Sequence, residues 1–163
     1  MAPVRDQPTS ETPSLILIAD DNVDTREIYA LYLTTVGYRV ETAEDGHEAI
    51  LRARAMHPDL IVMDLQMPKL DGWAAIRELQ GRAMTAAIPV IVLTGHDFKA
   101  FLKPAALAVG AVSYVMKPCL PEQLAGEIRA RLTARPSRGQ LPADLVPGAV
   151  RVDGAGPGRS SIS

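Results

Sequence analysis

The sequence predicts an α/β domain built on a doubly wound, parallel sheet of five strands with five helices. Three short segments are apolar at almost every position, which is typical of strands covered on both faces: residues 15–19, 60–63 and 89–93. Helical patterns separate these segments, and strands that alternate with helices favour parallel pairing with right-handed crossovers. The length of 163 residues, of which 47% are hydrophobic, suits one domain with a substantial core.

The first half of the chain follows this alternation. The strand at residues 15–19 leads into a helix that Asp24 or Thr25 can cap. The apolar residues of this helix recur at helical spacing: Ile28, Leu31, Tyr32 and Val36. Residues 38–42 alternate in polarity, as an edge strand with one wetter face does. A short helix over residues 45–55 then leads to the central strand.

The second half continues in the same way. Its regular elements are a helix at 71–79, the strand at 89–93, a strand at 111–116 and a helix at 121–134. Residues 97–109 form a further helical region that contains Pro104. A proline inside a helix lacks an amide hydrogen and clashes with the carbonyl four residues earlier. We therefore expect this helix to start late or to kink.

The folded domain is expected to span residues 14–135. Residues 1–13 contain three prolines among small and polar residues, which predicts a flexible lead-in. Residues 136–163 are rich in Pro, Gly, Arg and Ser, which predicts a disordered tail. No pattern indicates a second folded domain, so we expect the domain to act on its own.

Composition excludes several classes of partner. The formal net charge of −2 offers no basic surface for nucleic acid. Cys119 is the single cysteine, so an internal disulfide is excluded and a reducing compartment is consistent. No apolar run approaches the length of a membrane span, and no hydrophobic segment near the N-terminus marks a secretory signal. We expect a cytoplasmic protein that contacts neither membrane nor nucleic acid.

Four of the expected strands end on polar side chains. The first ends on Asp20 and Asp21, the third on Asp64, the fourth on Thr94 and the fifth on Lys117. The carboxyl ends of parallel strands meet at one edge of the sheet, where open α/β sheets bind ligands. Each residue alone has an ordinary explanation as a capping acid, a strand residue or a solvated charge. Their joint occurrence points to a site.

The chemistry of this set favours a metal and a phosphoryl group. Three clustered carboxylates repel one another by about 1 kcal/mol per close pair in water-like surroundings, and a divalent cation removes this cost. Ligands that are all oxygen suit Mg²⁺. With the metal bound, a carboxylate can attack phosphorus as a nucleophile. Lys117 then supplies a positive charge and Thr94 a hydroxyl donor, because phosphoryl transfer depends chiefly on positioning and charge neutralisation.

The segments that carry these residues resemble the receiver domain of two-component response regulators, the family with the fold of the chemotaxis regulator. The matching segments are LILIADDN around Asp20 and Asp21, LIVMDLQMPKLDGW around Asp64, VIVLTG around Thr94 and GAVSYVMKP around Lys117. They stand in the family's order and spacing over residues 14–134. The resemblance implies a flavodoxin-like sheet with the strand order 2-1-3-4-5, and a signalling module that is not an enzyme.

The resemblance also implies roles for individual residues. Asp64 accepts a phosphoryl group from a histidine kinase or a histidine phosphotransfer protein. Asp21 and Asp64 bind Mg²⁺ directly with the backbone carbonyl of Gln66, and Asp20 helps directly or through water. Gln66 and His96 tune how long the phosphoryl group survives, because they flank the path of the attacking water.

The resemblance further implies a switch. Thr94 moves toward the phosphoryl group, and Tyr114 follows it inward as the switch aromatic. This motion alters the surface of the fourth helix, fifth strand and fifth helix, to which a downstream protein binds. The sequence leaves open whether phosphorylation also produces a homodimer. The Lys117–Pro118 bond is similar to one that is often cis in the family.

Three other functions fit the residues less well. A Mg²⁺-dependent phosphohydrolase of the haloacid-dehalogenase type also uses an aspartate nucleophile, but places a second acid two residues after it, whereas Asp20 and Asp21 are adjacent. A DNA-binding regulator is disfavoured because no helix-turn-helix pattern follows residue 135. A flavin site is disfavoured because the loop after the first strand is acidic. The phosphohydrolase remains the alternative.

Overall fold

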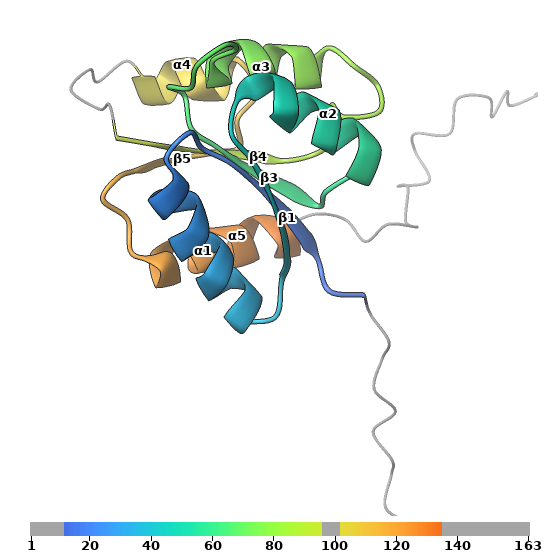
Figure 1. The fold of residues 1–163 in the computed structure, drawn as a ribbon. Helices are drawn as coiled ribbons and strands as arrows, with labels where there is room; N and C mark the ends of the chain where they lie inside the picture. Colours follow the sequence, from blue (N-terminus) through green and yellow to red (C-terminus); the bar gives the residue numbers. More distant parts are fainter. Residues whose placement is uncertain (1–11, 96–101, 135–163) are drawn as a thin grey trace, which may run out of the picture.

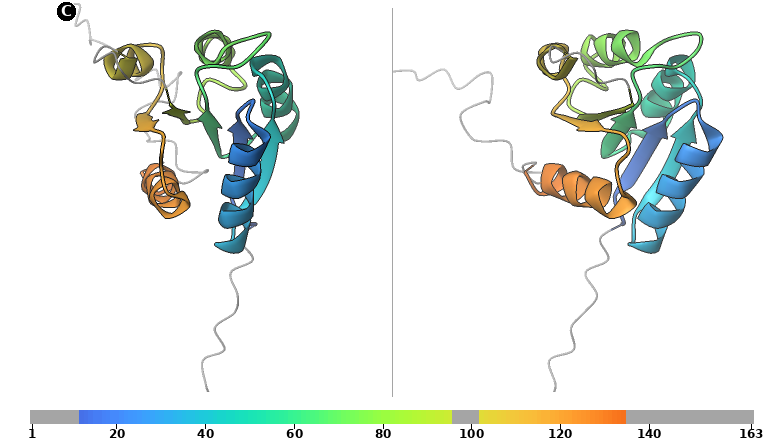
Figure 2. Two further views of the ribbon diagram at one scale, coloured as in Figure 1. Left: turned by 60° about the vertical axis from the view of Figure 1, so that its left-hand side comes forward. Right: turned by 90° about the vertical axis from the view of Figure 1, so that its left-hand side faces the viewer.

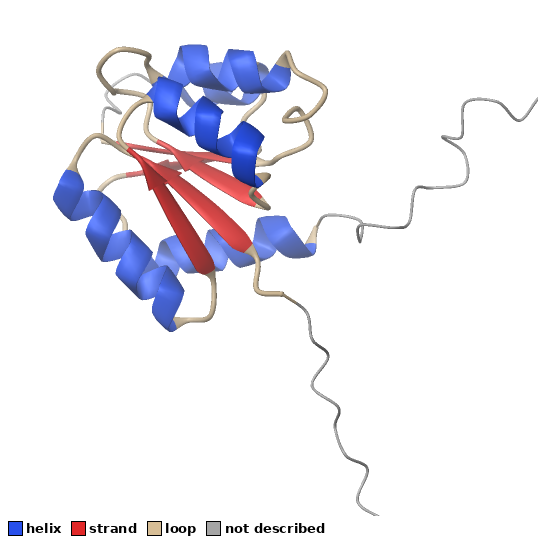
Figure 3. Ribbon diagram, turned by 45° about the vertical axis from the view of Figure 1, so that its right-hand side comes forward, coloured by secondary structure: helices blue, strands red, loops and turns tan. Residues whose placement is uncertain are grey.

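The fold is a parallel sheet of five strands between two layers of helices (Figures 1 and 3). The computed structural model describes residues 12–95 and 102–134. The strands are β1 (Leu15–Ala19), β2 (Arg39–Ala43), β3 (Leu60–Met63), β4 (Val90–Thr94) and β5 (Ser113–Met116). The predicted α/β class and the doubly wound parallel sheet are confirmed.

The strands lie side by side in the order β2-β1-β3-β4-β5, and every neighbouring pair is parallel. This order confirms the arrangement that the resemblance implied. The winding changes direction between β1 and β3, so a crevice forms beyond the carboxyl ends of these two strands. The register pairs Ala19 of β1 with Met63 of β3. The residues that follow, Asp20 and Asp64, therefore become neighbours.

Helices cover both faces of the sheet (Figures 1 and 2). One face carries α1 (Val23–Thr35) and α5 (Pro121–Thr133). The other face carries α2 (Gly46–Met56), α3 (Gly72–Gln80) and α4 (Leu102–Ala108). The sheet thus has an upper and a lower helical layer in Figure 1, and all its carboxyl ends open on one side between them.

Two hydrophobic clusters hold these layers together. In β1, Leu17 enters the cluster beneath α2 and α3, whereas Ile16 and Ile18 enter the cluster beneath α1 and α5. Full burial of such a side chain contributes about 1.5–3 kcal/mol. Because β1, β3 and β4 are buried on both faces, apolar residues fill every position except Thr94 at the end of β4, which explains the apolar runs in the sequence.

Three helices begin at side chains that cap their first turn. Asn22 accepts from the amide of Thr25, Asp45 from Glu48 and Asp71 from Ala74. The prediction that Asp24 or Thr25 caps the first helix was wrong. The Asn22 oxygen lies 2.9 Å from the Thr25 nitrogen, so α1 begins at Val23.

The packed face of α1 also differs from the expected one. Of the four apolar residues at helical spacing, Tyr32 packs against the cluster beneath α1 and α5. The other three are 57%, 72% and 43% exposed: Ile28, Leu31 and Val36. The residues of α1 that are buried are Arg26, Tyr29 and Leu33. A charged residue lies on the buried face because the Arg26 guanidinium finds partners within the fold, which apolar periodicity does not register.

The fourth helix is described from Leu102 to Ala108, within the segment expected from the sequence. Pro104 is the third residue of the described part of this helix. Residues 1–11, 96–101 and 135–163 lie outside the described residues. The lead-in, the tail and the domain boundaries therefore stay predictions. Within the described ranges, no helix is both long enough and apolar enough to cross a membrane.

Candidate functional site

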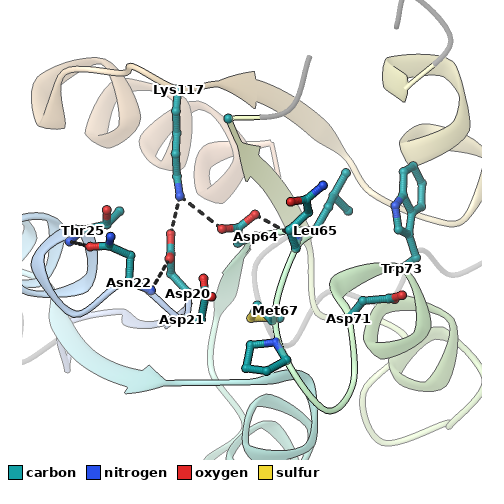
Figure 4. A pocket seen from close by; sticks show the side chains of 13 residues that line it. Asp20, Asp21, Asn22, Thr25, Asp64, Leu65, Met67, Asp71, Trp73 and Lys117 are labelled. Carbon is teal, nitrogen blue, oxygen red and sulfur yellow. Dashed lines mark hydrogen bonds and ion pairs between the residues drawn. The ribbon is translucent and has the colours of Figure 1, made fainter. Parts of the chain in front are cut away.

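Carboxylates gather at the ends of β1 and β3. The Asp64 amide donates to the carbonyl of Ala19 at 2.9 Å, which continues the ladder beyond the last strand residues. Asp20 and Asp64 are only 2% and 7% exposed, whereas Asp21 beside them is exposed. Carboxylate oxygens of these three residues lie within 4.8 Å of one another. The structure therefore brings the three predicted acids together (Figure 4).

Lys117 reaches this cluster from the loop after β5. Its Nζ lies 2.5 Å from Oδ2 of Asp20 and 3.2 Å from Oδ2 of Asp64. Figure 4 shows the side chain extending between the two carboxylates from above. The lysine side chain is 21% exposed, so this is a partly buried charge network rather than a surface ion pair. One cation here balances part of the charge of three acids.

The site shifts the pKa values of two of its groups upward. Burial raises the pKa of Asp64, and the opposing effects of the Gln66 amide and the Lys117 charge do not cancel it. Burial lowers the pKa of Lys117, but its hydrogen bond to Asp20 and the nearby negative charges outweigh burial and raise the pKa overall. Lys117 is therefore a cation throughout the neutral pH range.

The loop after β3 is held by close backbone packing. The Gln66 amide donates to Oδ1 of Asp64 at 3.1 Å, and the Gly72 amide donates to the carbonyl of Leu65 at 3.0 Å. A Cβ atom on Gly72 would lie 2.1 Å from the carbonyl oxygen of Asp64. The start of α3 therefore lies directly against the backbone of Asp64, and only glycine fits there.

A pocket of about 810 Å³ opens in front of these groups. Asp20, Asp21, Asp64 and Lys117 line one side, and Asp71 and Trp73 lie on the other (Figure 4). The carboxylates of Asp20, Asp21 and Asp64 supply oxygen ligands to this pocket. Such a donor set fits a hard divalent cation such as Mg²⁺, which keeps several waters and leaves positions for phosphate oxygens.

The remaining predicted residues lie at different distances from the pocket. Thr94 is fully buried at the end of β4, and within the described part of the chain its hydroxyl has no hydrogen-bond partner. Gly95, the next residue, lines the pocket, whereas Thr94 does not. Tyr114 is partly buried in β5 and packs against the cluster beneath α2 and α3. His96 lies outside the described residues.

Sequence reasoning missed two residues of α1 that support the site. The Arg26 guanidinium donates to the backbone carbonyl of Asp20 at 2.7 Å. The Tyr29 hydroxyl donates to the backbone carbonyl of Cys119 at 2.6 Å, two residues after Lys117. Neither partner could be read from the sequence, because each contact joins a side chain to a main-chain carbonyl of another loop. The Lys117–Pro118 peptide bond is cis, as the resemblance implied.

Comparison with known families decides what this arrangement is. A family model described as the response regulator receiver domain matches residues 16–129. This chain belongs to the response regulator receiver domain family. The family resemblance drawn from the four sequence segments is thereby confirmed.

Curated relatives of this receiver domain are similar over most of its length. The probable transcriptional regulator ycf27 of Cyanophora paradoxa is 40% identical, over 72% of this chain and 47% of its own length. The response regulator MprA of Mycolicibacterium vanbaalenii is 38% identical, over 74% of this chain and 51% of its own. The chain spans about half the length of the curated relatives that it matches.

Solved structures are similar over nearly their whole length. The chemotaxis response regulator CheY4 of Vibrio cholerae is 30% identical, with a TM-score of 0.68 over 74% of this chain and 99% of that chain. The receiver domain of the sensor histidine kinase PA1611 of Pseudomonas aeruginosa is 28% identical, with a TM-score of 0.69 over 76% and 100%. That structure is described with a magnesium ion coordinated in its active-site cleft. The receiver domain described here carries an aspartate cluster of the kind that suits this ion.

Proposed function

We propose that this receiver domain accepts a phosphoryl group on Asp64 and transmits the change to a protein partner. The observation that supports this most strongly is the Lys117 ammonium, which lies within 3.2 Å of both Asp20 and Asp64 in the lining of the pocket. A nucleophilic carboxylate, two further acids and a cation are the groups that phosphoryl transfer needs. The donor is a phosphohistidine on a histidine kinase or a histidine phosphotransfer protein.

The acids fit Mg²⁺ as the metal of this reaction. Asp21 and Asp64 would bind the ion directly with the backbone carbonyl of Gln66, and Asp20 would assist directly or through water. The bound ion neutralises charge on the phosphoryl oxygens. Asp21 is the exposed member of the cluster, so its carboxylate is accessible to an ion from solvent.

Asp64 then acts as the nucleophile. One of its carboxylate oxygens forms a bond to phosphorus while the bond from phosphorus to the histidine nitrogen breaks. The leaving imidazole keeps the electron pair, and an acyl phosphate remains on Asp64. Lys117 leaves its contact with Asp64 to pair with a phosphoryl oxygen, because that oxygen now carries the negative charge.

Thr94 and Tyr114 would carry the signal away from the pocket. The buried Thr94 hydroxyl has no partner among the described residues, so a phosphoryl oxygen offers it a first hydrogen bond. Its movement would leave space that Tyr114 fills, and this alters the surface formed by α4, β5 and α5. A downstream protein reads that surface. Homodimerisation of the receiver domain after phosphorylation would use the same surface.

An apolar surface beside the pocket suits the phosphohistidine protein. A second pocket of about 310 Å³ is lined by Lys117 together with Ile28, Pro118 and Cys119. Ile28 and the neighbouring Leu120 are 57% and 62% exposed. Because Lys117 lines both pockets, a helix that docks on this surface brings its histidine to Asp64. The exposed Ile28 of α1 would then contact the donor protein.

Gln66 and His96 are proposed to set the lifetime of the acyl phosphate, because each would flank the path of the attacking water. Gln66 is exposed beside Asp64. We expect the domain to act in the cytoplasm, where histidine kinases present their phosphoryl groups, and to signal by protein contact.

Incubation with acetyl phosphate and Mg²⁺, followed by intact-mass measurement, tests the proposal. The wild type should gain the mass of one phosphoryl group, hydroxylamine should remove it, and Asp64→Asn should gain none. An equal adduct on both proteins would place the acceptor elsewhere. Catalytic turnover of a generic phosphate monoester would instead favour the Mg²⁺-dependent phosphohydrolase.

A further inference from the structure

Helix α1 has a polar buried face that the proposed reaction does not yet use. Arg26 and Tyr29 lie three residues apart, and residues at this spacing share one face of a helix. They are 8% and 7% exposed. A buried guanidinium and a buried hydroxyl are costly unless they form hydrogen bonds, so their partners define what this face does.

Each of the two side chains donates to a backbone carbonyl outside α1. The Arg26 Nη1 atom lies 2.7 Å from the carbonyl oxygen of Asp20. The Tyr29 hydroxyl lies 2.6 Å from the carbonyl oxygen of Cys119. The second guanidinium nitrogen of Arg26 lies 3.4 Å from Oε1 of Glu44, which balances its charge.

The two carbonyls belong to the loops that carry opposite charges of the site. Asp20 ends β1 and begins the acidic loop. Cys119 follows the Lys117–Pro118 bond in the loop between β5 and α5. The contact between Lys117 Nζ and Asp20 Oδ2, at 2.5 Å, joins these two loops. One turn of α1 therefore holds both loops at once.

We propose that Arg26 and Tyr29 are a pair of positioning residues, of which Arg26 holds the acidic loop for the metal and Tyr29 holds the Lys117 loop for the phosphoryl group. This inference rests on the proposed phosphoryl acceptance at Asp64. Neither side chain touches the reacting atoms. They act through the main chain of the loops to which they donate.

The pair predicts two separable defects. Removal of the Arg26 guanidinium leaves the Asp20 carbonyl without its donor, so the acidic loop shifts and Mg²⁺ binds more weakly. The variant also leaves the Glu44 carboxylate without its cation, and that added negative charge favours cation binding. Weaker Mg²⁺ binding would therefore report a displaced loop and not the lost charge. Removal of the Tyr29 hydroxyl releases the loop of Lys117, which does not bind the metal. That change slows phosphoryl transfer at saturating Mg²⁺ and leaves the metal affinity unchanged.

The test measures MgCl₂ affinity by calorimetry and the maximal rate of adduct formation from acetyl phosphate at saturating Mg²⁺. Tyr29→Phe keeps the ring and should lower the maximal rate by about three- to tenfold, the factor of one typical hydrogen bond. Arg26→Met keeps the aliphatic stem and should weaken Mg²⁺ binding by about the same factor. Each variant should leave the other quantity within about twofold of wild type.

Two matched variants serve as controls. Tyr32→Phe removes the hydroxyl of another tyrosine of α1. Within residues 12–95 and 102–134, the Tyr32 hydroxyl forms no hydrogen bond. Arg52→Met removes a guanidinium of α2 that pairs with Glu41 and Glu48 and does not line the pocket. Both controls should match the wild type in metal affinity and in rate.

The outcomes separate this inference from the function on which it rests. If the wild type forms no adduct, the proposed function fails. If the wild type reacts but both variants match the controls, or if both quantities fall together in each variant, the positioning roles are overturned. If only one of the two variants shows its expected effect, Arg26 and Tyr29 do not act as a pair. If Arg26→Met does not fold, Arg26→Lys replaces it, with weaker Mg²⁺ binding again expected because its ammonium lacks the planar fork.

Discussion

The Lys117 ammonium and the Asp20 carboxylate, 97 residues apart in the chain, meet at 2.5 Å. Lys117 follows the edge strand β5, and Asp20 follows β1 near the middle of the sheet. The same ammonium lies 3.2 Å from Asp64. A lysine that bridges two acids in this way balances part of their charge when no metal is bound. The proposed Mg²⁺ and phosphoryl group would each displace part of this contact.

Replacement of Lys117 tests that relationship. Lys117→Met leaves two buried carboxylates without their cation, so the free energy of unfolding in EDTA should fall by about 1–2 kcal/mol. Saturating Mg²⁺ should remove most of this difference, because the metal then balances the acids. Urea denaturation with and without Mg²⁺ measures both values. Lys69→Met is the control, since Lys69 is 72% exposed and its pair with Asp45 contributes little. An equal loss in EDTA and in Mg²⁺ would contradict this role of Lys117.

The contact of Gly72 with Asp64 predicts a strong effect of a single methyl group. In Gly72→Ala the new Cβ would lie 2.1 Å from the carbonyl oxygen of Asp64, so the loop that carries Asp64 must move. We expect a loss of several kcal/mol in stability and a large fall in the rate of adduct formation.

Gly126→Ala is the matched control for this change. Gly126 lies within α5, and a Cβ there would meet nothing within 4 Å. Alanine should stabilise that helix by about 0.5–1 kcal/mol, and the rate of adduct formation should stay at the wild-type value. A Gly72→Ala protein as stable and as reactive as the wild type would show that the loop can adjust without cost.

Replacement of Thr94 should impair signalling without lowering the stability of the fold. Because the buried Thr94 hydroxyl has no partner among the described residues, Thr94→Val should be at least as stable as the wild type in urea denaturation. After phosphorylation, amide exchange in α4, β5 and α5 should change in the wild type and not in the variant.

Thr85→Val provides the comparison for Thr94. The Thr85 hydroxyl is also fully buried, but it donates to the carbonyl of Leu79 at 2.7 Å. Its replacement should cost about 1–2 kcal/mol. If Thr94→Val lost as much stability as Thr85→Val, the Thr94 hydroxyl would have a partner in the resting protein.

Asp45 predicts a pH dependence of stability. The amide of Glu48 lowers the pKa of Asp45, with help from Lys69 and against the effect of burial. A carboxyl group with a lowered pKa in the folded state stabilises the protein above its unfolded pKa of about 3.9, and loses this effect as the pH falls through the folded value. Asp45→Asn keeps an acceptor for the cap but not the charge. Its deficit in free energy of unfolding should be constant from pH 7 to about 5 and should shrink below about 4. A difference in free energy of unfolding that does not change with pH would show that packing, and not the charge of Asp45, causes it.

The sheet could be predicted from the sequence because burial on both faces leaves a simple pattern. Ile16 and Leu17 enter opposite clusters, so no position of β1 is free to be polar. A helix after the first strand was predicted, but its capping residue and its buried face were not. Ile28 and Leu31 follow the helical period and are exposed, whereas Arg26 is buried, because its partners come from other elements.

The acids and the lysine of the site were predictable because each stands directly after a strand. Parallel strands carry such residues to one edge whatever the loops do. The supporting contacts were not predictable. The Tyr29 hydroxyl donates to a backbone carbonyl 90 residues away in the chain. Because every residue has a backbone carbonyl, the side chains in the sequence do not indicate which carbonyl is the partner. The close approach of Gly72 to Asp64 likewise depends on how α3 packs.

The most direct test of the central claim is a crystal structure of the domain with Mg²⁺ and beryllofluoride, which imitates a bound phosphoryl group. We expect beryllium on Asp64 and one Mg²⁺ at about 2.0–2.1 Å from oxygens of Asp21, Asp64 and the Gln66 carbonyl. Lys117 and the Thr94 hydroxyl should each contact a fluoride. Beryllium on another residue, or a beryllofluoride that neither Lys117 nor Thr94 touches, would contradict the proposed role of Asp64 as the phosphoryl acceptor.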